Sequence, residues 1–316
     1  MNEVFGQFQY RVKRAVKGGA IRAGRCHDLR MHLALHPGAN RDNALQALRT
    51  VSTKVENLHT GFRGDATQLV LAYLEWANET VAQLTNQVSD RDIERLVFTR
   101  RYEHLLANAA HFGPGHLERF TNSLVRLELQ QRRAAFEEAV STLQSAIKRR
   151  VHADLNVLFD TSVFIHHPAK LEAIDWATLM GHRERVNLLV PMIVIDELDK
   201  LKEASKREAR WRARYTLAVI DRLFPTGNEP FVVLQQTEPG AQQTAVAVEI
   251  LYDPPQHARL PSADDEIIDR ALAMQPLVGR VRLFTYDTGQ STRARKAGLD
   301  VVKLPMLPEG DEPARS

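Results

Sequence analysis

Hydrophobic residues recur every three or four positions through most of the first half of the chain. The spacing is clearest in four segments, 42–59, 65–84, 92–110 and 116–151. It places the apolar side chains of each segment on one face of a helix and therefore predicts amphipathic helices. Asp42, Asp65 and Asp92 stand near the starts of three segments, where an aspartate side chain can cap a helix. We expect a helical bundle or an array of helical hairpins.

The pattern changes after residue 152. Short runs rich in apolar and β-branched residues replace the helical spacing, at 155–159, 187–190, 231–234, 245–251, 281–284 and 300–303. Stretches with helical spacing separate several of these runs. This alternation favours an α/β fold, a mostly parallel sheet flanked by helices. We therefore predict an all-α helical domain over 1–151, an α/β domain over 152–306 and a flexible tail over 307–316, whose polar, proline-containing sequence is typical of a frayed end.

The composition is that of an ordinary globular protein. Of the 316 residues, 44% are hydrophobic and 26% are charged. Cys26 is the only cysteine, which excludes an intrachain disulfide and a multi-cysteine zinc site and is typical of a reducing compartment. No apolar stretch approaches the roughly 20 residues of a membrane-spanning helix, and the first residues lack the apolar core of a secretory signal. We expect a cytoplasmic protein with no membrane partner.

Charge is unevenly distributed along the chain. Residues 1–150 contain 22 Lys and Arg against 15 Asp and Glu, whereas the remainder contains 20 against 24. The whole chain has a net charge of +3. A basic first half favours contact with a polyanion. We expect this half to bind RNA, a protein regulator or a second copy of the chain as a homodimer.

Acidic residues follow the predicted strands of the second half. Asp160 and Asp287 each come directly after an apolar run. Glu197 lies about two turns into a predicted helix, and Asp264 and Asp265 open another. Because ligands of open α/β sheets bind at the carboxyl ends of the strands, we expect these side chains to converge there.

Carboxylates that converge repel one another unless some are protonated or a cation binds between them. Oxygen ligands without cysteine or an ordered histidine set favour Mg²⁺ or Mn²⁺ over zinc. His166 and His167 are adjacent and would face different directions on a helix, so they do not predict a metal site. The sequence predicts one or two Mg²⁺ or Mn²⁺ ions at the acidic residues, where such ions polarise phosphoryl oxygens and activate water.

Four segments resemble, in order, the motifs of PIN-domain nucleases. They are VLFDTSVF (157–164), VPMIVIDELDKLK (190–202), SADDEIIDRAL (262–272) and LFTYDTGQSTRARKAGLDVV (283–302). The chain is most similar to the larger bacterial and RNA-surveillance members that contain an ELDxLK segment. The resemblance covers about residues 155–305 and leaves the helical half unexplained.

The resemblance implies a five-stranded parallel sheet and metal-dependent cleavage of RNA by a two-metal mechanism, leaving a 5′ phosphate and a 3′ hydroxyl. It also implies a long insertion with an extra β element over 235–261. The catalytic and metal-binding residues of the family fall on Asp160, Glu197, Asp264 and Asp287. Asp265 is an auxiliary metal ligand on this comparison, and the hydroxyls of Thr161, Ser162 and Thr285 support the acids. Asp264 is preferred to Asp265 because the family places an isoleucine three residues further on, as Ile267 is here.

Cations are needed to hold an RNA backbone beside so many acids. The candidate phosphate contacts are Lys202, Lys206, Arg210, Arg293 and Arg295. A solvated helix face with local ion pairs explains the basic run after Glu197 equally well. Trp211 in this run could stack a base, but we expect it in the core, together with Trp76 and Trp176.

Three other functions were weighed. A catalytically inactive PIN-like platform that binds RNA or protein is the main alternative, although such a platform is expected to have lost some of the acids. A haloacid-dehalogenase-type phosphatase needs an aspartate two residues after the first, where Ser162 stands. The toxin of a toxin–antitoxin pair fits the chemistry, but those toxins are compact single domains. We therefore predict a cytoplasmic endoribonuclease.

Overall fold

A computed structural model describes most of the chain. The described residues are 33–112, 117–150, 153–181, 185–227, 229–235, 245–255 and 257–306. The predicted tail and residues 1–32 of the predicted helical domain lie outside them. Among the described residues, no helix is both long and apolar enough to cross a membrane.

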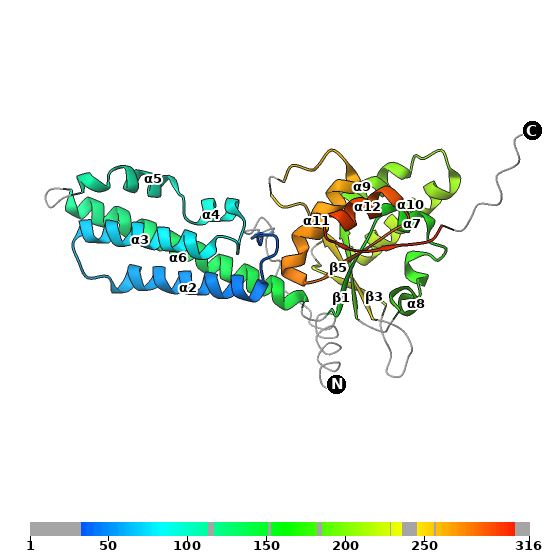
Figure 1. Cartoon of the computed structure of the whole chain (residues 1–316), viewed down its shortest axis with the longest axis horizontal. Coiled ribbons are helices and arrows are strands. Elements are labelled where there is room, and N and C mark those ends of the chain that lie inside the picture. The colour runs from blue at the N-terminus through cyan, green and yellow to red at the C-terminus, as the bar shows by residue number, and fades with distance from the viewer. Residues whose placement is uncertain are drawn as a thin grey trace, which may run out of the picture. The chain divides into compact units, whose positions relative to one another are not determined.

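Helices make up the described part of the first half, as predicted (Figure 1). They are α2 (Arg41–Gly61), α3 (Ala66–Leu84), α4 (Asp90–Leu96), α5 (Arg100–Ala107) and α6 (Glu118–Arg150), with the short 3₁₀ helix η1 (Ala109–His111) after α5. Helices α2 and α3 pack on each other and on the 33-residue α6. Leu48, Tyr73 and Phe136 are among the side chains fully buried between them.

The single helix predicted over 92–110 is wrong, because the chain breaks between α4 and α5. At the break, Thr99 accepts a hydrogen bond from the backbone N–H of Tyr102 and caps α5. Its hydroxyl also donates to Oε1 of Glu128 at 2.8 Å, and Arg101 pairs with Oε2 of Glu128 at 2.7 Å. Glu128 is 1% exposed and also pairs with Arg132 of its own helix at 3.0 Å, so the break adds two partners to a buried carboxylate.

Of the three predicted helix caps, only Asp65 is one. It forms a capping box with Gln68 at the start of α3. Asn40 caps α2 in place of Asp42, and Ser89 caps α4 in place of Asp92. Both helices begin earlier than the predicted segments, which moves the two aspartates into their first turns.

Six strands form one sheet in the second half. They are β1 (Leu155–Phe159), β2 (Val186–Pro191), β3 (Val232–Gln235), β4 (Val246–Leu251), β5 (Val281–Thr285) and β6 (Asp300–Lys303). Their order is β3-β4-β2-β1-β5-β6, and every neighbouring pair is parallel except β3 with β4. The parallel part thus has the five strands that the resemblance implies. The additional strand is β3, before the 235–261 segment where an extra element was expected, and β4 in that segment is an ordinary parallel strand.

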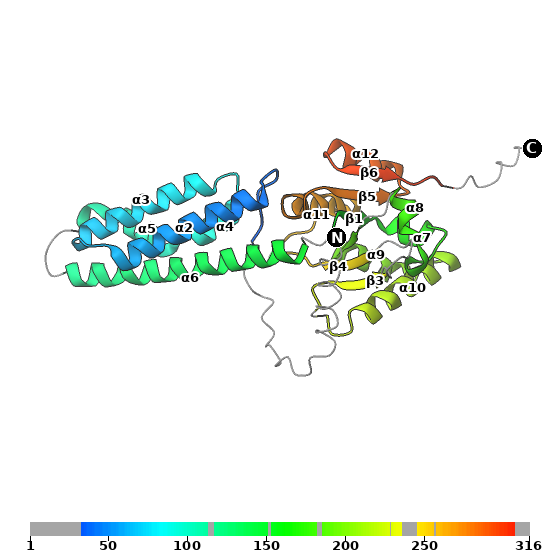
Figure 2. The ribbon, with the colours of Figure 1, turned by 90° about the horizontal axis from the view of Figure 1, so that it is seen from below.

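Helices flank this sheet (Figure 2). They are α7 (Thr161–His166), α8 (Trp176–Met180), α9 (Met192–Leu201), α10 (Arg207–Leu223), α11 (Ala263–Val278) and α12 (Thr288–Lys296), with the 3₁₀ helix η2 (Leu171–Ala173) before α8. Strands β1 and β2 are buried along their whole length, as expected for central parallel strands. The α/β fold preceded by a helical region is therefore confirmed.

The tryptophans divide between core and surface. Trp176 is 1% exposed and stacks on Phe159 of β1, and Trp76 is 5% exposed among α3 and α6. The predicted core position of Trp211 is wrong, because this side chain is 47% exposed. Helix α10 buries the stripe formed by Ala213, Leu217 and Ile220, and Trp211 lies outside that stripe.

A row of polar side chains crosses the middle of the sheet and ends on α6. Arg150 of α6 makes a two-point ion pair with Glu249 of β4, through Nε to Oε2 at 3.1 Å and through Nη2 to Oε1. Asn187 of β2 donates to Glu249 Oε2 and to Asn156 Oδ1 of β1, each at 3.3 Å. Asn156 donates to the carbonyl of Val278 at 3.2 Å. This row fastens the last turn of α6 to the sheet; a domain boundary near residue 152 stays a prediction.

Candidate active site

Asp160 occupies the carboxyl end of β1, at the first residue before α7. It is 4% exposed, and its Oδ2 accepts hydrogen bonds from Ser162 Oγ at 2.5 Å and Thr285 Oγ1 at 2.8 Å. Burial raises the pKa of Asp160, and the hydrogen bonds from the two hydroxyls oppose that rise. The first motif therefore holds a carboxylate that is costly to ionise and fixed in orientation.

Gln290 is a contact of Asp160 that sequence reasoning missed. It is fully buried in the first turn of α12. With its amide turned so that Nε2 faces the acid, it donates to Asp160 Oδ2 at 2.7 Å and to Oδ1 at 3.1 Å. A glutamine in the first turn of a helix is common, so the sequence offered no signal for this contact.

Glu197 lies on α9, in the sixth position of that helix, and is half-buried. Thr161 Oγ1, from the residue after Asp160, donates to its Oε2 at 2.6 Å. Burial is the largest cause that raises the pKa of Glu197, and the charges of Asp160 and Asp264 raise it further. Glu197 therefore lies within electrostatic reach of acids from two other elements.

Asp264 stands in the first turn of α11, which Ser262 caps. Burial raises its pKa most, followed by the charge of Asp160; Asp287 and Asp265 add to the rise, and Arg293 opposes it. Arg293 of α12 pairs with Asp264 through Nη2 and approaches Asp265 Oδ1 with its Nε at 3.2 Å. The two acids of the third motif thus share one guanidinium.

Asp287 follows β5 and caps α12. Its Oδ1 accepts from the backbone N–H of Gln290 at 2.6 Å, and its own N–H donates to Thr285 Oγ1 at 2.9 Å. The side chain is exposed, unlike that of Asp160. Thr285 is fully buried between the two acids and fixes the geometry of β5 relative to β1.

The structure thus brings the predicted acids to one edge of the sheet. Asp160, Glu197, Asp264 and Asp287 come from four different elements, yet their charges act on one another. Each of the three predicted supporting hydroxyls donates a hydrogen bond to one of these acids. The shared edge is where the carboxyl ends of β1, β2 and β5 lie, because these strands are parallel.

Comparison with known proteins identifies this part of the chain. A family model described as PIN domain matches residues 157–304. Residues 157–304 form a PIN domain. No curated protein matches the chain. One solved structure, described as a domain of a functionally unknown protein from Methanocaldococcus jannaschii DSM 2661, is 15% identical over 51% of this chain and 99% of its own, with a TM-score of 0.31. PIN domains are generally nucleases, so the fold here is of a nuclease type.

The donor set of the PIN domain fits a hard divalent cation. The four acids offer only carboxylate oxygens, which Mg²⁺ and Mn²⁺ prefer. Burial is the largest cause that raises the pKa of Glu197 and of Asp264, and the neighbouring carboxylates raise it further. A cation bound between the carboxylates would remove their repulsion. The exposed Asp287 and half-buried Asp264 leave the group open on one side.

The predicted phosphate contacts differ in their surroundings. Lys202 Nζ pairs with Asp199 Oδ1 at 2.5 Å, and Arg210 Nη1 donates to the carbonyl of Ala204 at 3.3 Å. Lys206 precedes the first turn of α10 and Arg295 lies on α12, both exposed. Arg293 is the member of this set that already contacts the acids.

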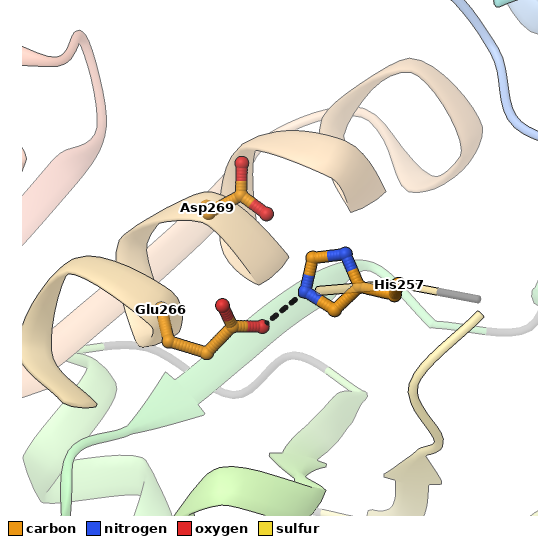
Figure 3. A group of neighbouring side chains, drawn as sticks. All are labelled: His257, Glu266 and Asp269. Carbon is orange, nitrogen blue, oxygen red and sulfur yellow. Dashed lines mark hydrogen bonds and ion pairs between the residues drawn. The ribbon is translucent and has the colours of Figure 1, made fainter. Parts of the chain in front are cut away.

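A second group of ligating side chains lies outside the four acids. The ligand atoms of His257, Glu266 and Asp269 all lie within 4.8 Å of one another (Figure 3). Arg270 belongs to the same group, with Nε 3.3 Å from Glu266 Oε1 and Nη2 paired with Asp269. Because this guanidinium already balances the carboxylates, the group is explained as a structural anchor.

That anchor holds the segment that leads into α11. Glu266 is fully buried and accepts hydrogen bonds from His257 Nε2 at 2.7 Å and from the backbone N–H of Leu260 at 2.8 Å. Arg259 of the same segment bonds Asp196 of α9, next to Glu197, at 2.5 Å. The segment therefore connects the two helices that supply Glu197 and Asp264.

Proposed function

We propose that the PIN domain is a metal-dependent ribonuclease that cleaves phosphodiester bonds within RNA, with one or two Mg²⁺ or Mn²⁺ ions. The observation that carries this proposal is that four acids from four separate elements lie at one edge of the sheet, where Asp160 acts electrostatically on Glu197 and on Asp264. Repulsion of this kind destabilises the metal-free fold, so a structural purpose for it is hard to find. A cation site gives the repulsion a function.

The acids and hydroxyls have different tasks in this proposal. Asp160, Glu197, Asp264 and Asp287 would hold the cation, and Asp265 would assist. The bound ion supplies a Lewis acid that polarises the phosphoryl oxygen and lowers the pKa of water. Ser162 and Thr285 both donate to Oδ2 of Asp160, and Thr161 donates to Glu197. These bonds hold the carboxylates in one orientation, as the hydrogen-bonded supports of metal ligands do.

Positive side chains near the acids would position the RNA backbone. Arg293 neutralises Asp264 and Asp265 in the structure. A cation bound to Asp264 would take over that role and free the guanidinium for a phosphate, which it can bind with two parallel hydrogen bonds. Lys202, Lys206, Arg210 and Arg295 would add charge further from the reaction.

The proposal is tested by incubating purified protein and an Asp160→Asn variant with labelled RNA in Mn²⁺, Mg²⁺ or chelator. We expect cleavage by the unchanged protein with metal only, and a loss of at least about 100-fold in Asp160→Asn. The matched control is Asp221→Asn, the same change at an exposed position of α10, which should cleave normally. Analysis of the product ends should give 5′ phosphates.

Two outcomes would refute the proposal. Equal cleavage by Asp160→Asn and the unchanged protein would point to a contaminating nuclease or a wrong site. RNA binding without cleavage in either metal would favour the inactive binding platform. A homodimer or a regulator bound through residues 1–151, and a cytoplasmic location, stay predictions alongside this proposal.

A further inference from the structure

An aromatic patch with two cations lies on the surface of the PIN domain, outside the four acids. It consists of Trp211 and Tyr215 of α10 with Lys170 and Arg212, and is called the aromatic patch below. The two rings stack with centroids 5.6 Å apart and planes inclined by 20°. Lys170 Nζ lies 5.2 Å from the centroid of each ring, and the Arg212 guanidinium carbon 5.8 Å from that of Trp211. Trp211 nevertheless stays 47% exposed.

The polar ends of the aromatic patch are held in place by other contacts. The Tyr215 hydroxyl donates to Glu172 Oε2 at 2.7 Å. Arg212 donates to the carbonyl of Pro168 at 2.8 Å and to that of Ala169 at 3.3 Å. These bonds order the side chains before any ligand arrives, which lowers the entropic cost of binding. Because the Trp211 indole stacks on the Tyr215 ring and stays exposed, it is a preformed stacking surface.

The aromatic patch connects to the acids through the end of α7. Arg212 is bonded to the two residues that follow His167, and the His166 ring lies 6.1 Å from the ring of Tyr286, edge to face. Tyr286 directly precedes Asp287. A strand lying across the acids can therefore continue over Tyr286 and Arg212 to Trp211.

An unpaired nucleobase is the ligand that this combination suits. Aromatic side chains bind bases of single strands by stacking, largely independent of sequence, while nearby cations contact the phosphates. Bases inside a duplex have no free face to offer. The cores of protein interfaces are depleted in lysine, whereas here Lys170 lies over both rings.

We propose that the aromatic patch binds an unpaired base of the RNA substrate by stacking on Trp211, with Lys170 and Arg212 contacting the adjacent phosphate. The RNA that reaches the aromatic patch is then unpaired at that base. This inference rests on the proposed ribonuclease function for the path of the strand.

The test compares the full chain with Trp211→Ala and Trp211→Phe variants. Binding of a fluorescein-labelled single-stranded RNA is measured by anisotropy in chelator, so that no cleavage occurs, and a duplex of the same sequence is measured beside it. We expect Kd for the single strand to rise at least about five-fold in Trp211→Ala, the lower end of what one stacked base contributes. Trp211→Phe should restore most of the affinity, and the duplex should bind equally to all three proteins.

Further measurements exclude a merely structural effect. Because Trp211 lies on the surface, the three proteins should unfold at the same temperature. Asp221→Asn, a change at another exposed side chain of α10, should leave the affinity nearly unchanged. With metal present, Trp211→Ala should raise KM for single-stranded RNA and leave kcat nearly unchanged.

The outcomes separate this inference from the ribonuclease proposal. If Trp211→Ala and the unchanged protein bind single-stranded RNA with equal affinity and cleave it normally, the inference is overturned while the ribonuclease proposal stands. The aromatic patch would then be a site for a protein partner. Trp211-dependent binding of single strands without cleavage in any metal overturns the nuclease and keeps the base-binding role. Equal loss of duplex and single-strand affinity in Trp211→Ala also overturns the inference.

Discussion

Replacing Arg150 by methionine should destabilise the sheet, although this residue lies at the end of the helical half. The side chain of Arg150 is 10% exposed and that of its partner Glu249 is 12% exposed. The guanidinium contacts both carboxylate oxygens, and Arg150 Nη1 also donates to the carbonyl of Ala146 at 3.3 Å. Arg150→Met therefore leaves the Glu249 carboxylate buried with Asn187 as its remaining hydrogen-bond donor among the described residues.

The magnitude follows from the geometry of this pair. Removal of one partner of a buried ion pair costs about 3–5 kcal/mol, because the other charge stays buried without compensation. The bond from Asn187 at 3.3 Å and uptake of a proton by Glu249 both reduce the loss, so we expect about 3 kcal/mol. For a folding unit of about 200 residues this corresponds to a decrease in Tm of roughly 6–12 °C.

Chemical denaturation of the full chain, followed by circular dichroism, measures this change. Arg149→Met is the matched control, since Arg149 is an exposed neighbour on the same helix and its loss should cost less than about 0.5 kcal/mol. The double variant Arg150→Met with Glu249→Leu should regain much of the lost stability, because no charge is left buried.

Two results would refute this reasoning. If Arg150→Met and Arg149→Met had the same stability, the pair would not fasten α6 to the sheet. If the double variant were as unstable as the sum of the single ones, packing of the arginine stem would matter and the charge would not. The same measurement bears on the predicted boundary near residue 152, because a fragment that begins at residue 153 lacks Arg150 and should lose similar stability.

Three further predictions concern the acids and the anchor. In chelator at pH 7, Asp160→Asn should unfold at a higher denaturant concentration than the unchanged protein, because burial raises the pKa of Asp160 and makes its ionised form costly in the folded state. The stability gain should vanish near pH 4, where the carboxyl becomes protonated. A gain independent of pH would contradict the argument. Mn²⁺ at about 100 times its Kd should stabilise the unchanged protein by about 2.7 kcal/mol in thermal unfolding, and should stabilise Asp160→Asn much less. Equal stabilisation of the two proteins would mean that the ion binds elsewhere. Glu266→Ala should lower the free energy of unfolding by about 3 kcal/mol, because it leaves Arg270 and His257 without their buried partner. The control Glu208→Ala, at an exposed position, should change it little, and similar decreases in both variants would exclude the anchor.

The sequence alone determined the class of fold and predicted which acids share one edge of the sheet. Periodicity distinguishes helices from strands because a helix repeats its faces every 3.6 residues and a strand every two. All six strands were therefore found within a residue or two of their observed bounds. Asp160 and Asp287 were predicted because each follows an apolar run and the carboxyl ends of parallel strands meet at one edge of a sheet. Glu197 and Asp264 were predicted from the order of the motifs that resemble PIN-domain nucleases.

Only the tertiary structure showed how the supporting side chains reach the acids, and only it revealed Gln290 among them. Gln290 and Thr285 reach Asp160 because β5 pairs with β1 and α12 follows β5, and no local pattern records that pairing. At the break before α5, Thr99 bonds Glu128, which is distant in sequence. Trp211 was expected in the core, but its exposure depends on which stripe of α10 packs into the core. Such contacts join residues far apart in the chain, and the hydrophobic pattern carries information only about near neighbours.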